Sequence, residues 1–99
     1  MKVLVVCAGG MSSAILLKAI RLEAEKQGME LDLKAIGAHE LENELPNADL
    51  ALVAPQIRHR YASLSEVGKR LNKPVCLIPA AGYTPLGASK VLEIIKKEL

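Results

Sequence analysis

Four short segments of the chain carry the hydrophobic patterns of β-strands. Residues 2–6, 49–54 and 75–79 are nearly continuous apolar runs, which is typical of strands buried on both faces. Residues 29–36 instead alternate between apolar and charged positions. This period of two predicts a half-exposed strand, and therefore an edge of the sheet. Its inner face should carry Met29, Leu31, Leu33 and Ala35.

The segment between the first two strands predicts a helix. Ser12 or Ser13 can cap its start, and Gly28 is expected to end it, with Lys26 in the last turn. Apolar residues recur along it at helical spacing, and we expect these to form the buried stripe. They are Ile15, Ala19 and Leu22.

Two more helices are predicted in the second half of the chain. The first covers residues 56–71, after Pro55 stops the preceding strand. Its apolar stripe comprises Ile57, Tyr61, Leu64, Val67 and Leu71. The second can be capped by Thr84, with Pro85 at its first position, where proline is well tolerated. Its stripe comprises Ala88, Val91, Leu92, Ile95 and Leu99. The acidic segment 39–45 predicts a turn or two of helix at most.

The alternation of strands and helices predicts an α/β fold of three layers, α/β/α, in one domain spanning residues 1–99. Strands separated by helices favour a parallel sheet covered on both faces. Right-handed crossovers, together with an edge position for the second strand, predict the strand order 2-1-3-4.

Composition narrows the function classes. The chain has 99 residues, of which 51% are hydrophobic and 24% charged, so it can bury a hydrophobic core and remain in solution. Its net charge of +2 is too small to indicate a surface that binds nucleic acid. No apolar run approaches the roughly 18 residues that a membrane span needs. The apolar run at the start, MKVLVVC, is too short for a signal peptide. We therefore expect a cytoplasmic protein.

The candidate chemistry lies where the first strand meets the first helix. Ligands of open α/β sheets bind outside the carboxyl ends of the strands, at the point where the winding reverses. Cys7 lies at that point, and the small residues from Ala8 to Ser13 lead into a helix start. Unpaired N–H groups and the helix dipole suit such a turn to an anion. The same field favours thiolate, which is the nucleophilic form of cysteine.

The glycine-rich turn does not match the common nucleotide-binding motifs. The Walker A spacing G-x-x-x-x-G-K-[ST] is absent, and adjacent Gly9 and Gly10 do not form a dinucleotide-binding G-x-G-x-x-G. Cys7 could simply be a small buried residue in a tight turn. Cys76 is far away in the sequence and is expected to be a small core residue. The two cysteines form no metal-ligand pattern, and we expect no metal and no cofactor.

The stretch CAGGMSSAILL resembles the phosphocysteine loop of the IIB components of the lactose/cellobiose class of the bacterial sugar phosphotransferase system. APQIRHRY (54–61) and GYTPLGASKVL (82–92) resemble later segments of the same family. The fold that the resemblance implies is the 2-1-3-4 sheet of flavodoxin-like and phosphatase-I-like proteins. The last loop departs from the family, because IPAAGYTPLG has no carboxylate and Leu86 precedes Gly87.

The resemblance implies a phosphoryl relay. A phosphohistidine of the IIA component would pass its phosphoryl group to Cys7, and the phosphocysteine would pass it to a sugar held by the membrane-embedded IIC component. The protein would then touch the membrane only through IIC. The phosphoryl oxygens would be held by the backbone amides of the loop, which are those of Ala8, Gly9, Gly10, Met11, Ser12 and Ser13.

Several other residues are candidates for contacts with the loop or a partner. Gln56, Arg58 and Tyr83 are expected at the same end of the sheet as Cys7 and Met11. Arg58, His59 and Arg60 could meet an acidic partner or could form a solvated helix face. His39 has no evident partner in the sequence and is expected at the surface.

Three alternative functions remain open at this point. Low-molecular-weight tyrosine phosphatases and arsenate reductases use a similar loop, but the phosphatase pattern C-x5-R places Ser13 where the arginine should be. No aspartate that could act as general acid follows in AAGYTP. A regulatory anion-binding module and a redox-sensitive thiol are the other two readings. In either case Cys7 would have a role that does not involve phosphoryl transfer.

Overall fold

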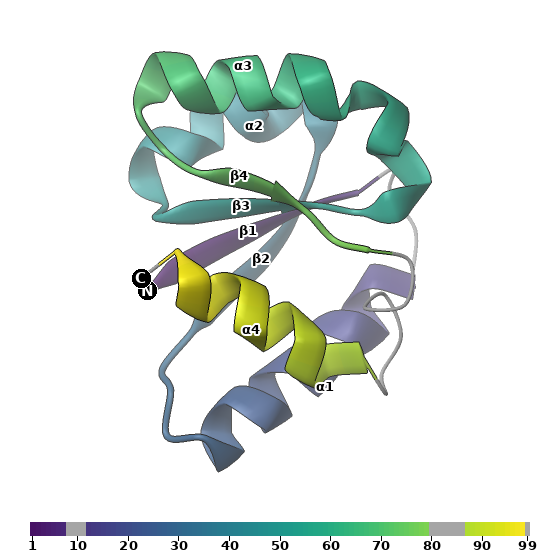
Figure 1. The fold of residues 1–99 in the computed structure, drawn as a ribbon, viewed down its shortest axis with the longest axis vertical. Coiled ribbons are helices and arrows are strands. Elements are labelled where there is room, and N and C mark those ends of the chain that lie inside the picture. Colours follow the sequence, from purple (N-terminus) through teal and green to yellow (C-terminus); the bar gives the residue numbers. More distant parts are fainter. Residues whose placement is uncertain (8–11, 80–86, 99) are drawn as a thin grey trace.

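The strands form one parallel sheet. The computed structural model describes residues 1–7, 12–79 and 87–98. The sheet comprises β1 (Lys2–Cys7), β2 (Asp32–Gly37), β3 (Leu50–Val53) and β4 (Val75–Leu77), in the order β2-β1-β3-β4 (Figure 1). The α/β class and the strand order predicted from the sequence are therefore confirmed. The four carboxyl ends lie along one edge, because Cys7 pairs with Gly37, Val6 with Val53, and Val53 with Leu77.

Helices cover both faces of the sheet (Figure 1). One face carries α1 (Ser12–Lys26) and α4 (Ala88–Lys97). The other carries α2 (Leu41–Glu44) and α3 (Tyr61–Leu71). Short 3-10 helices accompany α2 and α3, and these are η1 (Ala38–Glu40), η2 (Leu45–Asn47) and η3 (Pro55–Arg60). No helix in the described ranges is long and apolar enough to cross a membrane.

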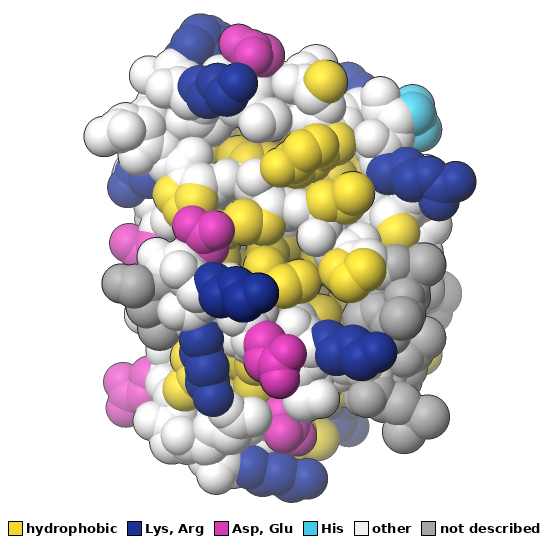
Figure 2. Space-filling view, in the orientation of Figure 1, with side chains coloured by type: hydrophobic (Ala, Val, Ile, Leu, Met, Phe, Trp, Pro, Cys, Tyr) yellow, Lys and Arg dark blue, Asp and Glu magenta, His cyan; other side chains and the backbone are white. Residues whose placement is uncertain are grey.

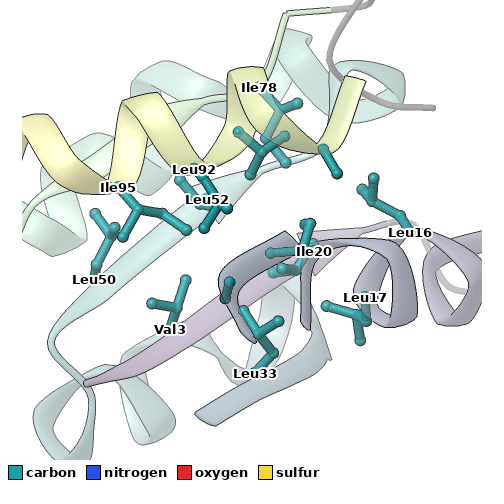
Figure 3. Close-up of a cluster of buried hydrophobic side chains, with 14 residues drawn as sticks. Val3, Leu16, Leu17, Ile20, Leu33, Leu50, Leu52, Ile78, Leu92 and Ile95 are labelled. Atoms are coloured by element: carbon teal, nitrogen blue, oxygen red, sulfur yellow. The ribbon is translucent and has the colours of Figure 1, made fainter. Parts of the chain in front are cut away.

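Two hydrophobic clusters hold the layers together. Residues of β1 and β3 point alternately into each, since successive side chains of a strand face opposite sides of the sheet. Val3 and Leu50 pack with Ile20 of α1 and Ile95 of α4, as Figure 3 shows. On the other face, Leu4, Val6 and Ala51 pack against residues of α2 and α3. β1 and β3 are thus buried on both sides, as their apolar runs predicted.

The buried face of α1 differs from the predicted one. Ile15 and Leu22, predicted to be buried, are 62% and 51% exposed. The residues that do enter the core are Leu16, Leu17, Ile20 and Ala24. Two overlapping helical repeats run along this segment, and only the position of the sheet and α4 decides which one is buried. The end of α1 is as predicted: Gly28 has a φ of 73°, and Met29 N donates to Ala24 O at 2.8 Å.

The second strand is shorter than predicted. It begins at Asp32, three residues after Met29, because Met29 completes the end of α1. Leu33 packs on the α1–α4 side, while Ile36 packs on the α2–α3 side. Ala35, predicted to lie on the inner face, is exposed. The edge position of this strand is confirmed.

The region after β3 is a 3-10 helix followed by an α-helix, where the sequence predicted one continuous helix. Backbone angles at Ile57 (φ −119°, ψ 28°) interrupt η3 before α3 begins. The predicted stripe still faces inward, with Ile57 and Leu64 buried and Tyr61 partly buried. In α4 the predicted residues Ala88, Val91, Leu92 and Ile95 are all buried. The predicted cap Thr84, together with Pro85 and Leu99, lies outside the described residues.

The β4 edge leaves apolar surface exposed. Figure 2 shows hydrophobic side chains gathered between α3 and α4, over β4. Leu77 of β4 is exposed there, and Cys76 is partly exposed. Lysines and arginines surround this patch in the same view.

Candidate functional site

Cys7 ends β1 at the point where the winding of the sheet reverses. The connection from β1 to β2 runs through α1 on one face, and the connection from β2 to β3 runs through α2 on the other. The side chain of Cys7 is 7% exposed. Its Sγ donates to the Ile36 carbonyl oxygen at 3.8 Å. This position is where ligands of open α/β sheets bind, and α1 begins five positions later, at Ser12.

Cys7 lines a cleft of about 560 Å³ at the carboxyl edge of the sheet. We call this the Cys7 cleft. Its two walls are the segments that follow β2 and β3, the strands on either side of β1. A thiol in the central strand is thus enclosed by residues that are distant from it in sequence.

The wall after β2 runs from Gly37 to Glu40. The Glu40 carboxylate folds back on this segment, where Oε1 accepts a hydrogen bond from Gly37 N at 3.2 Å. His39 Nε2 lies 3.8 Å from the same oxygen. The turn is tight at Gly37, because a Cβ there would lie 2.8 Å from His39 Cε1. A side chain at residue 37 would therefore require the exposed His39 ring to move aside.

The wall after β3 comes from η3. Gln56 and His59 line the cleft, as do Ile57 and Arg60. The spacing of three is the period of a 3-10 helix, in which side chains at i and i+3 lie over one another. Arg58 is exposed and does not line the cleft.

The structure brings some of the predicted site residues together. Cys7 and Gln56 share the cleft, whereas Arg58 is not among the residues that line it. Ser12 and Ser13 form the start of α1. Tyr83 and the loop residues Ala8, Gly9, Gly10 and Met11 lie outside the described residues.

Sequence reasoning missed three basic residues of the cleft. His39 is exposed, as predicted, and it also lines the Cys7 cleft. His59 and Arg60 were grouped with Arg58 as one charged run. The strand order 2-1-3-4 could have predicted these residues, because the segments that follow the second and third strands must flank the end of the first.

Cys76 is different in character from Cys7. It was expected in the core, but it is only partly buried, because it lies on the edge strand β4. Burial, together with a hydrogen bond to Glu98 and the charge of that carboxylate, raises the pKa of the Cys76 thiol to about 11. Its Sγ lies 3.4 Å from Glu98 Oε1. Cys76 packs against the α1–α4 cluster and Cys7 in the α2–α3 cluster, so the two thiols belong to different faces of the sheet.

Known proteins share this architecture and sequence pattern. The lactose-specific IIB domain of the phosphoenolpyruvate:carbohydrate phosphotransferase system from Streptococcus pneumoniae has a TM-score of 0.84 and 26% identity, over 99% of this chain and 96% of that one. A cellobiose-specific IIB component from Borrelia burgdorferi has a TM-score of 0.80 and 28% identity, over 99% and 90% of the two chains.

Sequence comparison leads to the same group. The chain is 26% identical over 92 residues to the oligo-beta-mannoside-specific EIIB component of Bacillus subtilis (strain 168), which covers 93% of this chain and 89% of that protein. The family model for the lactose/cellobiose-specific IIB subunit of the PTS system matches residues 2–94. These matches confirm the resemblance predicted from the cysteine loop. The chain therefore belongs to the lactose/cellobiose-specific IIB family of the sugar phosphotransferase system.

Proposed function

We propose that this IIB protein carries a phosphoryl group on Cys7, between a IIA phosphohistidine and a sugar bound by the membrane component IIC. The observation that supports this most is the position of the thiol. It lies at the carboxyl end of the central strand β1 and lines a cleft that is large enough to admit part of a donor. The relay would take place in the cytoplasm, at the inner face of the membrane when IIC is engaged.

The chemistry needs two displacements at phosphorus. In the first, the Cys7 thiolate attacks, an S–P bond forms, and the N–P bond of the phosphohistidine breaks with its electron pair left on nitrogen. In the second, a sugar hydroxyl attacks, an O–P bond forms and the S–P bond breaks. The thiolate is regenerated and the hydroxyl proton passes to water. Positioning and charge stabilisation are what phosphoryl transfer mainly requires.

The phosphoryl group would be held by the backbone at the start of α1. The first N–H groups of a helix have no partner within the helix, and its dipole favours an anion there. We assign this role to the amides of Ala8 to Ser13, as the family resemblance implies. Gln56, which lines the Cys7 cleft, can add a side-chain amide donor.

A relay must store its phosphoryl group rather than lose it to water. Ser13 replaces the arginine of the phosphatase loop, which favours storage. Glu40 and Arg60 do reach the Cys7 cleft from other segments, so hydrolysis needs a direct test. The Glu40 carboxylate is held by Gly37 N, within its own wall, and we expect it not to act as a general acid toward a phosphocysteine.

The two cysteines provide a matched test. The wild-type chain, Cys7→Ser and Cys76→Ser are each supplied with phosphoenolpyruvate, the general phosphotransferase enzymes, a IIA protein and vesicles that contain a IIC component. Formation of sugar phosphate should be lost in Cys7→Ser and retained in Cys76→Ser. Equal loss in both variants, or activity in Cys7→Ser, would contradict the proposed role. A phosphocysteine that hydrolyses rapidly without IIC would favour the phosphatase alternative instead.

A further inference from the structure

We propose that Arg60 forms a phosphoryl-binding subsite on the η3 wall of the Cys7 cleft, with His59 beside it. Both side chains are exposed and line the same cleft as the thiol. The subsite would receive the phosphoryl oxygens as the group moves onto or off the sulfur. It deepens the proposed function and depends on it only for the transfer measurement described below.

Among the residues that the structure describes, nothing pairs with the guanidinium of Arg60. Of the four arginines in the chain, Arg21 donates to the Leu33 carbonyl oxygen at 2.9 Å, and Arg70 pairs with Glu42 at 3.0 Å. Within the described residues, the Arg60 side chain makes neither a hydrogen bond nor an ion pair. A guanidinium that lines the same cleft as a candidate phosphoryl acceptor, and that has no described partner, is suited to an anion.

The chemistry of arginine fits a phosphoryl group in particular. Its planar guanidinium donates two parallel N–H bonds to two oxygens of one phosphoryl group. In the transition state of phosphoryl transfer the negative charge is spread over the three equatorial oxygens, where such a clamp acts. The cysteine loop itself has Ser13 in place of an arginine. Arg60 would supply this clamp from a different segment of the fold, and storage of the phosphoryl group would then depend on the lack of a general-acid aspartate in AAGYTP.

The charge on the opposite wall places the anion nearer to η3. Glu40 is the acidic residue that lines the cleft, and its carboxylate would repel a phosphoryl group. That carboxylate accepts a hydrogen bond from Gly37 N and lies near His39. It is therefore held on the β2 side, which leaves the Arg60 side as the favourable position.

Arg58 is a matched control within the same six-residue helix. It is also exposed and has no side-chain partner among the described residues, but it does not line the cleft. Both arginines accept hydrogen bonds only through their backbone carbonyls, Arg58 from Tyr61 N and Arg60 from Ser63 Oγ. Replacing either side chain with alanine preserves these bonds and removes one positive charge. Any difference between Arg58→Ala and Arg60→Ala therefore reports position rather than charge.

The first test does not require phosphoryl transfer. Inorganic phosphate is titrated into the full chain, and its binding is followed through the amide NMR signals of Cys7 and residues 56–60. Loss of a hydrogen bond to a charged group should weaken binding in Arg60→Ala by about tenfold or more. Arg58→Ala should stay within about twofold of wild type. Phosphate that perturbs none of these signals, or that binds equally well to both variants, overturns the subsite.

The second test measures transfer from phosphorylated IIA to Cys7. We expect Arg60→Ala to lower kcat by about tenfold, with KM nearly unchanged, and Arg60→Lys to restore part of the rate. A rise in KM alone would mean that Arg60 contacts the surface of the partner, which overturns the subsite. If wild-type Cys7 accepts no phosphoryl group at all, the proposed function fails, and the phosphate titration still decides whether the subsite exists.

Discussion

The Cys7 thiol of β1 donates a hydrogen bond to the Ile36 carbonyl oxygen of β2, at 3.8 Å. The neighbouring residue of β2, Gly37, is the register partner of Cys7. The sulfur is thus tied to the strand that begins one wall of its own cleft. The sheet itself therefore helps to position the sulfur, through a backbone carbonyl of the neighbouring strand.

This contact predicts that Cys7→Ser remains folded. This contact is long, so little is lost when the shorter serine hydroxyl fails to reach the carbonyl, and water in the Cys7 cleft can bond to the hydroxyl instead. The free energy of unfolding should therefore change by no more than about 1 kcal/mol. Urea denaturation, followed by circular dichroism, measures the change. A variant that is largely unfolded would contradict the expectation, and Cys7→Ala would then serve as the transfer-dead control.

A second prediction concerns the contact between α3 and β4. A Cβ added to Gly68 would lie 2.5 Å from Val75 Cγ2 and 2.7 Å from the Lys73 carbonyl oxygen. The carbonyl belongs to the backbone and cannot move away cheaply, because Lys73 N is itself bound to Gly68 O at 2.9 Å. Gly68→Ala should therefore destabilise the protein by about 1–3 kcal/mol, although alanine is the better helix former.

The control for this prediction is Lys69→Ala, one residue further along α3. Lys69 is exposed, and among the described residues its ammonium group pairs only with Glu66, at 3.5 Å. Exposed pairs contribute little, so its unfolding free energy should stay within about 0.5 kcal/mol of wild type. A Gly68→Ala protein as stable as this control would show that the helix can move away from β4.

The third prediction tests which face of α1 is buried. Ile20 is fully buried, whereas Leu22 is 51% exposed. Truncation of a buried isoleucine removes apolar burial and leaves a cavity, so Ile20→Ala should cost about 2–5 kcal/mol. Leu22→Ala should cost less than about 1 kcal/mol, since much of its surface is already in water. Urea denaturation of the two variants decides between the observed face and the one predicted from the sequence, which would reverse this order.

The fourth prediction is a pH effect at Cys76. Burial and Glu98 raise the pKa of this thiol from 9.0 to about 11. The rate of Cys76 alkylation by iodoacetamide, measured in Cys7→Ser, should therefore rise with a midpoint near pH 11. In Glu98→Gln the midpoint should move down toward 9.0, while Glu93→Gln leaves it unchanged. A midpoint near 9.0 in the parent protein would contradict the burial of this thiol.

The same shift has a consequence for stability. The folded state holds the Cys76 proton more tightly than the unfolded state, because the pKa of the thiol is higher in the folded chain. The raised pKa of Cys76 therefore adds to the free energy of unfolding. This contribution is complete below about pH 9 and is lost as the pH rises toward 11. Removal of the Glu98 charge should reduce this loss. Urea denaturation of the parent protein and of Glu98→Gln, each at pH 8 and at pH 10.5, measures how much stability each protein loses.

Much of the fold follows from local pattern. The apolar runs of β1 and β3, the αL glycine at Gly28 and the stripe of α4 each correspond to one physical requirement, and each was predicted. The face of α1 was not, because SSAILLKAIRLEAEK supports two helical repeats and its neighbours decide between them. The short β2 was missed because Met29 ends a helix rather than starting a strand.

The candidate site was predictable only in part. Cys7 followed from a strand, a small-residue turn and a helix start in succession, which is a local signal. The presence of His39 and Arg60 in the same cleft depends on how β2 and β3 flank β1. The separation of Arg60 from Arg58 depends on the 3-10 geometry of η3, which the hydrophobic pattern of residues 56–71 conceals.

The phosphoryl group proposed on Cys7 can be detected by mass spectrometry. The wild-type chain is incubated with phosphoenolpyruvate, the general phosphotransferase enzymes and a lactose/cellobiose-type IIA protein, and then analysed by intact mass and peptide mapping. We predict one added phosphoryl group, located on Cys7 and absent from Cys76. An unmodified chain after incubation with several competent IIA proteins, or a phosphoryl group on any other residue, would contradict the account.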